Sequence, residues 1–212
     1  MSKEDLHKLK MYWEYEIRDK DGKVIKKGKF KSKSWTGRIV ELLYCLFHQY
    51  DHYTATLDTS YTDRLSPEEI TGHDGTKIAI PTGYNVATRG VRAPAGETFG
   101  IAVGSDSTPV SIDDYYLKSI ITHGTGSGQL EYGGTTLESL TRGDTYYFRV
   151  IRTFTNNSGA DVVVREVGLI LEVCTKKDTK GYFMIARDVP STEITVPDGK
   201  TLTLRYVVSY TL

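Results

Sequence analysis

Cysteine is almost missing from this sequence, which has two in 212 residues. Cys45 and Cys174 lie far apart, each among apolar residues, so they indicate neither a disulfide framework nor a metal site with paired ligands. Each is expected to pack as a small buried hydrophobic side chain. Neither charge is in excess, because 27 Lys and Arg balance 27 Asp and Glu. Since nucleic-acid-binding proteins usually carry a basic face, no direct contact with nucleic acid is expected.

Long hydrophobic runs are missing as well. Residues 1–17 contain no apolar segment of signal-peptide length, and no stretch is long enough to cross a bilayer. These absences predict a soluble protein that is made in the cytoplasm and has no membrane partner. The sequon at residues 156–158 would then be no more than a turn.

Tyrosine, by contrast, is abundant, with 15 copies, and threonine is frequent. Both residue types favour half-buried pleated surfaces, whereas the six prolines lie at apparent corners. The composition therefore predicts a mainly β protein.

The N-terminal segment has the pattern of a β-hairpin. Trp13, Tyr15 and Ile17 alternate with Tyr or Glu neighbours, which is the period of a strand with one buried face. Residues 19–23 contain an Asp-Gly turn signal, and residues 24–30 return as the second strand.

The lysines of residues 26–33 form the one basic stretch that could be a binding patch. They alternate with glycine, phenylalanine and serine, which is typical of the solvated face of a strand. Lysine-rich strands at a sheet edge also resist unwanted pairing. We therefore expect an exposed edge strand here.

Residues 35–49 predict the one convincing helix of the chain. Ser34 is a good N-cap, and apolar side chains follow at helical spacing. These apolar residues are Ile39, Leu42, Leu43, Leu46 and Phe47.

Residues 51–96 lack sustained periodicity and predict an irregular excursion with a short strand at residues 77–81. Because long irregular segments in compact domains are often functional, this excursion is the first choice for contacting a partner. The aromatic residues proposed to make such contacts are Tyr50, Tyr53, Tyr61 and Tyr84.

Residues 97–212 show short strands separated by turn signals, typical of an antiparallel sandwich or barrel. Residues 152–173 are predicted to form a hairpin around an Asn-Asn-Ser-Gly turn. Residues 108–121 are predicted to form a turn followed by a short strand. In residues 201–212 every second side chain is apolar, which is the clearest strand pattern of the chain.

The predicted fold is mainly β, a jelly-roll-like antiparallel β-sandwich with an N-terminal β-hairpin and one amphipathic helix. Jelly-roll and immunoglobulin-like connections leave the same pattern at this level. The parts are residues 1–50, the excursion 51–96 and the sandwich core 97–212, which together form one structural unit.

Two features resemble ligand sites without meeting their requirements. Residues 124–128 are glycine-rich but lack the Gly-Lys-Ser/Thr ending of a phosphate-binding loop, so turn positions explain them better. His48 and His52 have the spacing of a metal pair, with His73 or His123 as a further ligand. A helix C-terminus, where cations are favoured, explains the pair more simply. No cofactor or metal is predicted.

A catalytic constellation is also not found. No serine lies in a Gly-x-Ser-x-Gly turn, and neither cysteine has the surroundings of a nucleophile. The carboxylate pairs at residues 68–69 and 113–114 are adjacent in sequence, whereas a glycosidase needs two carboxylates converging on a cleft. The Arg-Gly-Asp tripeptide at residues 142–144 suits a turn. We expect a protein that is not an enzyme.

Four segments occur in a familiar order: DKDGKVIKKG, FGIAVGSDSTPVSIDDYYLKSIITHGTGSGQLEYGG, IRTFTNNSGADVVVREVGLI and FMIARDVPSTEITVPDGKTLTLRYVVSYTL. In this layout the chain resembles virion structural proteins of tailed phages and archaeal viruses, over residues 19–37 and 99–212. The resemblance implies a non-enzymatic component of the virus particle, capsid-associated or in the neck, tail or baseplate. It brings no catalytic residues with it.

The leading hypothesis is therefore a multi-copy virion subunit whose partners are itself, as a homo-oligomer, and other virion proteins. Sheet faces and edges can pair across symmetric interfaces, and aromatic residues are enriched there. A second hypothesis is a sandwich module that recognises a host glycan or surface protein, with the four tyrosines stacking on sugar rings. A third, a polysaccharide hydrolase, would need two converging carboxylates.

Overall fold

The computed structural model describes residues 8–32, 90–138, 141, 145–176 and 179–211. Within these residues the chain is mainly β and the named strands pair antiparallel, as predicted. No helix is formed among the described residues. In chain order the strands are β1 (Lys8–Arg18), β2 (Val24–Lys31), β3 (Gly100–Gly104), β4 (Glu131–Tyr132), β5 (Thr136–Leu137), β6 (Thr145–Thr155), β7 (Val162–Val164), β8 (Glu166–Lys176), β9 (Thr179–Asp188), β10 (Ile194–Val196) and β11 (Thr201–Thr211).

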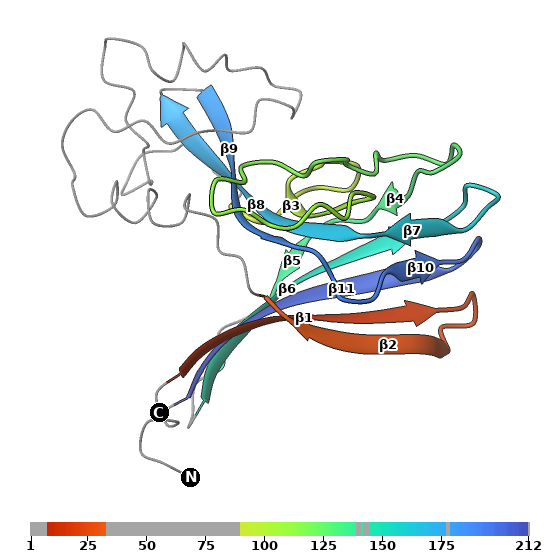
Figure 1. The fold of residues 1–212 in the computed structure, drawn as a ribbon, viewed down its shortest axis with the longest axis horizontal. Helices are drawn as coiled ribbons and strands as arrows, with labels where there is room; N and C mark the ends of the chain where they lie inside the picture. Colours follow the sequence, from red (N-terminus) through yellow and green to blue (C-terminus); the bar gives the residue numbers. More distant parts are fainter. Residues whose placement is uncertain (1–7, 33–89, 139–140, 142–144, 177–178, 212) are drawn as a thin grey trace.

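The strands of the described residues form three sheets. The largest has the order β2-β1-β11-β6-β4, and β5 also pairs with β6. The second has the order β3-β8-β9, and the third consists of β10 and β7. In Figure 1 the long strands β1, β11 and β6 curve together to the lower left, whereas β8 and β9 diverge to the upper left. The large sheet and the β3-β8-β9 sheet therefore splay apart at this end.

The three sheets contribute side chains to the same hydrophobic cluster. Trp13 of β1 is central to it, because the period-two pattern turns Trp13 and Ile17 to the buried face. The Trp13 ring packs edge-on against Tyr206 of β11 with centroids 4.6 Å apart. Its indole N–H donates a 2.8 Å hydrogen bond to Asp188 at the end of β9. This bond ties the largest sheet to the second one.

The N-terminal hairpin forms as predicted and belongs to the largest sheet, because β1 pairs with both β2 and β11. Its turn is closed by the Asp19 carboxylate, which accepts hydrogen bonds from the N–H groups of Asp21 and Lys23. Gly22 supplies the positive φ of 79° that this turn requires. β2 lies at the sheet edge with its lysines exposed, which confirms the prediction for this lysine-rich strand.

The prediction of a hairpin over residues 152–173 is wrong. β6 pairs with β11, β4 and β5, whereas β7 pairs with β10 and β8 with β3 and β9. Residues 156–161 therefore carry the chain from one sheet to another. The first predicted strand is part of β6, whereas the second is divided at Arg165 into β7 and β8 of different sheets. The alternation of apolar side chains contains no information about which strand each one pairs with.

The short strand predicted within residues 108–121 is also not formed. This segment is a loop whose end touches β3 through an isolated bridge between Gly104 and Ile120. Polar side chains of the loop form hydrogen bonds with nearby backbone groups, which are then not available for pairing with a strand. One example is the hydrogen bond from the Thr108 N–H to the Asp106 carboxylate. The loop begins after β3 and covers residues 105–119.

Asn156 joins two corners of the fold. It is fully buried at the end of β6, and its amide group donates to the carbonyl oxygens of Ala160 and Val196. Its side-chain oxygen accepts from the Ser158 N–H and hydroxyl. Its backbone N–H bonds to Lys200 in the corner between β10 and β11. One side chain thus fastens the β6–β7 corner to the β10–β11 corner.

Replacing Asn156 with alanine is expected to lower the free energy of unfolding by about 3 kcal/mol, because it leaves buried backbone groups without partners. The matched control is Asn157→Ala, since Asn157 is exposed and its side chain donates a hydrogen bond to the carboxylate of Glu131. That change should cost less than about 0.5 kcal/mol, as surface substitutions usually do. Urea unfolding of both variants measures the difference, and equal losses would contradict the role assigned to Asn156.

Residues 35–49, where the amphipathic helix is predicted, lie outside the described residues. The same holds for the strand predicted at residues 77–81 and for most of the excursion 51–96. The end of this excursion is described from Gly90, which forms a bridge with Glu172 of β8, to Gly96. Ala93, between them, is part of the hydrophobic core.

Candidate functional site

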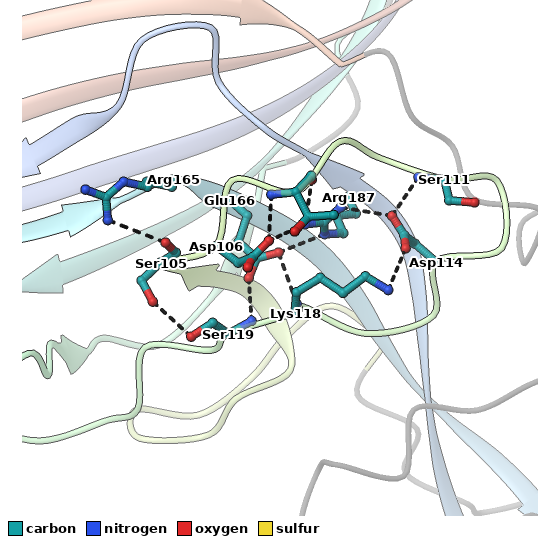
Figure 2. A network of polar contacts seen from close by, with 10 residues as sticks. Ser105, Asp106, Ser111, Asp114, Lys118, Ser119, Arg165, Glu166 and Arg187 are labelled. Atoms are coloured by element: carbon teal, nitrogen blue, oxygen red, sulfur yellow. Dashed lines mark hydrogen bonds and ion pairs between the residues drawn. The ribbon is translucent and has the colours of Figure 1, made fainter.

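A buried group of charged side chains lies where the 105–119 loop meets β8 and β9 (Figure 2). Arg187 of β9 is fully buried at its centre. Its guanidinium lies 2.7 Å from a Glu166 oxygen of β8 and 2.9 Å from an Asp114 oxygen of the loop. Asp106 contributes a further carboxylate at 3.7 Å. We call Arg187, Glu166, Asp114 and Asp106 the Arg187 cluster.

The Arg187 cluster fixes the path of the loop. Arg187 also donates to the Thr108 carbonyl oxygen at 3.1 Å. Glu166 accepts hydrogen bonds from the backbone N–H groups of Lys118 and Ser119. Both ends of the loop are therefore held by side chains that belong to the β8–β9 hairpin.

The surroundings of Asp114 keep it charged. Burial would raise the pKa of its carboxyl, but the Ser111 N–H, the Lys118 ammonium and the Arg187 guanidinium together place this pKa below its ordinary value. The Lys118 ammonium lies 2.9 Å from Asp114, and this hydrogen bond raises the pKa of Lys118. The contacts of Asp114 thus remain ionic at neutral pH.

The chemistry of the Arg187 cluster is structural. Arg187 and Glu166 are fully buried, and their polar atoms already bind partners, so a substrate has no access to them. Asp114 is buried in its ion pairs, whereas its neighbour Asp113 is exposed, so the two do not converge on a cleft. What the cluster achieves is the rigid presentation of the loop tip, residues 109–113.

Arg152 has a similar role at the other side of the core. It is almost fully buried on β6, and its guanidinium lies 4.7 Å from the centre of the Tyr132 ring. It donates hydrogen bonds to five backbone carbonyl oxygens, those of Pro94, Glu97, Phe99, Ile101 and Gly133. Arg152 thus holds the segment before β3 against the large sheet.

One end of the largest sheet is formed by the start of β1, the end of β11 and the start of β6. Toward this end the side chains on the core face become more exposed, as three successive rows of directly paired residues show. The buried row is Trp13, Tyr206 and Val150. The next row, half-buried, is Met11, Val208 and Phe148. The last row is Leu9, Tyr210 and Tyr146, which are 50%, 37% and 41% exposed. We call these last two rows the open sheet end.

The open sheet end is unusual because it is a continuous apolar surface on an ordered sheet. Directly paired residues on neighbouring strands lie on the same face, so Leu9, Tyr210 and Tyr146 form one strip across β1, β11 and β6. Figure 1 shows these strands leaving the upper layer at this end. Contiguous exposed apolar surface of this kind marks interaction sites in soluble proteins.

The glycine-rich residues 124–128 form a turn, as predicted. The Gly126 N–H is bound by the Gln129 side chain, and the Gly124 N–H by the Leu130 carbonyl oxygen, so neither amide points at a phosphate. A surface hollow of about 430 Å³ lies between this turn and β7. Arg165 at its rim is paired with Glu193 at 2.8 Å.

The residues proposed from the sequence as ligand contacts are mostly outside the described part of the chain. This holds for Tyr50, Tyr53, Tyr61 and Tyr84, for His48, His52 and His73, and for residues 142–144. His123 is described, and its Nδ1 accepts a hydrogen bond from the Tyr132 N–H. Among the described residues no group of His, Cys, Asp and Glu could hold a metal ion. No helix in that part is long and apolar enough to cross a membrane.

Sequence reasoning missed the Arg187 cluster, Arg152 and the open sheet end. A signal existed for Arg152, because it falls on the apolar face of its strand between Val150 and Phe154. Glu166 and Arg187 likewise interrupt strongly apolar strands. The open sheet end gave no signal, because its residues continue the pattern of the buried ones.

Comparison of the chain with protein-family models, with curated proteins and with solved structures gives no match. Its function has to be inferred from the geometry of the chain itself. Among the described residues, the open sheet end leaves apolar side chains of three neighbouring strands accessible to a partner.

Proposed function

We propose that this protein is a non-enzymatic structural subunit of a virus particle, present in many copies and acting through protein–protein contacts. The observation that carries the proposal is the open sheet end, with its strip of Leu9, Tyr210 and Tyr146. Exposed apolar and aromatic surface of this kind is the usual centre of a protein interface. The partners are further copies of the chain and other virion proteins.

The energetics favour burial of this strip in an assembly. Removing apolar surface from water contributes about 25 cal/mol per Å², and aromatic side chains bury the largest areas. The strip is carried by three paired strands of 11 residues each, so little order is lost on binding. A rigid apolar face therefore supports assembly better than it supports a catalytic role.

The finer description of the fold belongs to the same proposal. We take the large sheet and the β3-β8-β9 sheet to be the two layers of a jelly-roll-like antiparallel sandwich. The shared core, the Trp13–Asp188 hydrogen bond and the corners joined by Asn156 support this arrangement. The resemblance of residues 99–212 to virion proteins points to the same class of building block.

The proposal predicts self-association that depends on the open sheet end. Light scattering over a wide concentration range, with electron microscopy of the same samples, should show oligomers larger than the 23.8 kDa chain. The double variant Leu9→Ser/Tyr146→Ser should shift the equilibrium toward monomer by at least about tenfold, which corresponds to about 1.4 kcal/mol of lost interface energy.

The matched control is Ile25→Ser on β2. Ile25 is 48% exposed but lies in the edge strand, outside the open sheet end. This variant should assemble like the unchanged protein. A chain that stays monomeric at every concentration would contradict the proposed function, as would equal effects of the control and the double variant.

A further inference from the structure

The described residues contain a second exposed apolar feature, in a loop that is anchored on a different sheet from the open sheet end. Ile112, in the tip of the 105–119 loop, is 70% exposed, the highest value among the exposed large hydrophobic residues, and Val110 beside it is 38% exposed. The loop is anchored on β8 and β9 through Arg187 and Glu166, whereas the open sheet end belongs to β1, β11 and β6. The chain thus carries a projecting apolar tip and a separate apolar face.

The loop tip is held in one conformation. The Ser111 N–H donates to the Asp114 side chain, and the Asp113 N–H to the Ser111 hydroxyl. The Asp114 N–H donates back to the Ser111 carbonyl oxygen, which closes a tight turn under Ile112. Side chains fixed before binding lose little entropy on docking, so a rigid exposed isoleucine is suited to anchor a contact.

The charges around the two features are of opposite sign. In the loop, Asp106 and Asp114 are paired with Arg187, and Asp113 provides the exposed negative charge of the tip. The exposed lysines beside the open sheet end are Lys10 of β1 and Lys31 of β2, which pairs with Tyr12. β2 borders the open sheet end, since the Ser32 N–H bonds to the Met11 carbonyl oxygen. Opposite charges beside matching apolar surfaces favour encounter and fix orientation.

We propose that the loop tip of one copy docks on the open sheet end of the next copy, with Ile112 and Val110 against the Leu9–Tyr146 strip. This contact rests on the proposed multi-copy function and specifies its interface. Because tip and face are different surfaces, the contact is head-to-tail. Such contacts repeat from copy to copy and build rings or filaments, whereas an isologous contact that uses one patch twice stops at a dimer.

Two variants that each destroy one half of the contact test the proposal. Ile112→Asp places a charge in the apolar loop tip and leaves the open sheet end intact. Leu9→Asp places a charge in the open sheet end and leaves the loop tip intact. Both positions are exposed, so both variants should fold, which circular dichroism and thermal unfolding can check. The unchanged chain should form assemblies larger than a dimer, while each variant alone should remain monomeric by light scattering.

The decisive sample is the equimolar mixture of the two variants. The intact tip of Leu9→Asp can dock on the intact face of Ile112→Asp, but neither end of this pair can extend it. Native mass spectrometry should therefore show a heterodimer of about twice the 23.8 kDa chain mass and nothing larger. Ile25→Asp serves as the control for adding a charge at an exposed isoleucine and should assemble like the unchanged chain.

The other outcomes separate this inference from the proposed function. If the unchanged chain assembles but the mixture stays monomeric, or if Ile112→Asp alone still assembles, the head-to-tail contact is wrong while the structural role stands. An unchanged chain that never exceeds a dimer also overturns it. If the unchanged chain is monomeric at all concentrations, the proposed function and the contact fail together.

Discussion

Replacing Arg187 with leucine is expected to lower the free energy of unfolding by about 3–5 kcal/mol, the usual cost of removing one partner from a buried ion pair. The guanidinium is fully buried between Glu166 and Asp114, at 2.7 and 2.9 Å. Its loss leaves two buried carboxylates without their shared cation. It also frees the Thr108 carbonyl oxygen that Arg187 holds. Urea unfolding followed by circular dichroism measures the change.

The matched control is Arg165→Leu. Arg165 also forms an ion pair at 2.8 Å, with Glu193, but both side chains are substantially exposed. Exposed pairs contribute about 0–1 kcal/mol, so this variant should unfold almost like the unchanged protein. The double variant Arg187→Leu/Glu166→Gln should recover part of the loss, because the amide removes one of the stranded charges and keeps an acceptor oxygen for the loop backbone. Equal losses for Arg187→Leu and Arg165→Leu would show that the cluster does not stabilise the fold.

The second large effect is expected for Arg152→Leu, with a loss of about 4 kcal/mol, since a buried acceptor left without a donor costs about 1–3 kcal/mol. Arg152 donates to the carbonyl oxygens of Pro94, Glu97, Phe99, Ile101 and Gly133, some of which would gain water when the arginine is lost. The segment held by Arg152 should open locally more often than the whole protein unfolds. Amide hydrogen exchange should therefore accelerate most in residues 93–101.

Two further variants make this expectation specific to the guanidinium. Arg152→Lys should not restore stability, because an ammonium has three donors at one point and cannot reach carbonyls on several sides. Arg149→Leu, on the same strand, removes an exposed pair with Glu138 at 3.1 Å and should cost about 1 kcal/mol or less. Full stability of Arg152→Lys would mean that the charge, rather than the fork of donors, holds the segment.

The residues of the candidate sites differ in how far the sequence could have revealed them. A charged side chain on the apolar face of a strand, as at Arg152, indicates a buried and paired group without naming its partners. The partners of Arg187 come from a loop and a neighbouring strand, and Asp114 is 73 residues away. Contacts between residues this far apart in the sequence depend on how the strands pair, and local periodicity contains no information about that pairing.

The sequence by itself determined where the long strands of the largest sheet form. The alternation around Trp13 and along residues 201–212, the Asp-Gly turn and the lysine-rich edge strand all depend on neighbours within a few residues, so local patterns predict them. Tertiary structure alone decided which strands pair, and it made residues 156–161 a corner between two sheets instead of the turn of a hairpin. It also decided which part of an apolar face is covered: Trp13 and Leu9 belong to the same pattern of the same strand, yet one is buried and the other exposed. Coverage depends on where the opposite sheet diverges, and that is a property of the whole fold.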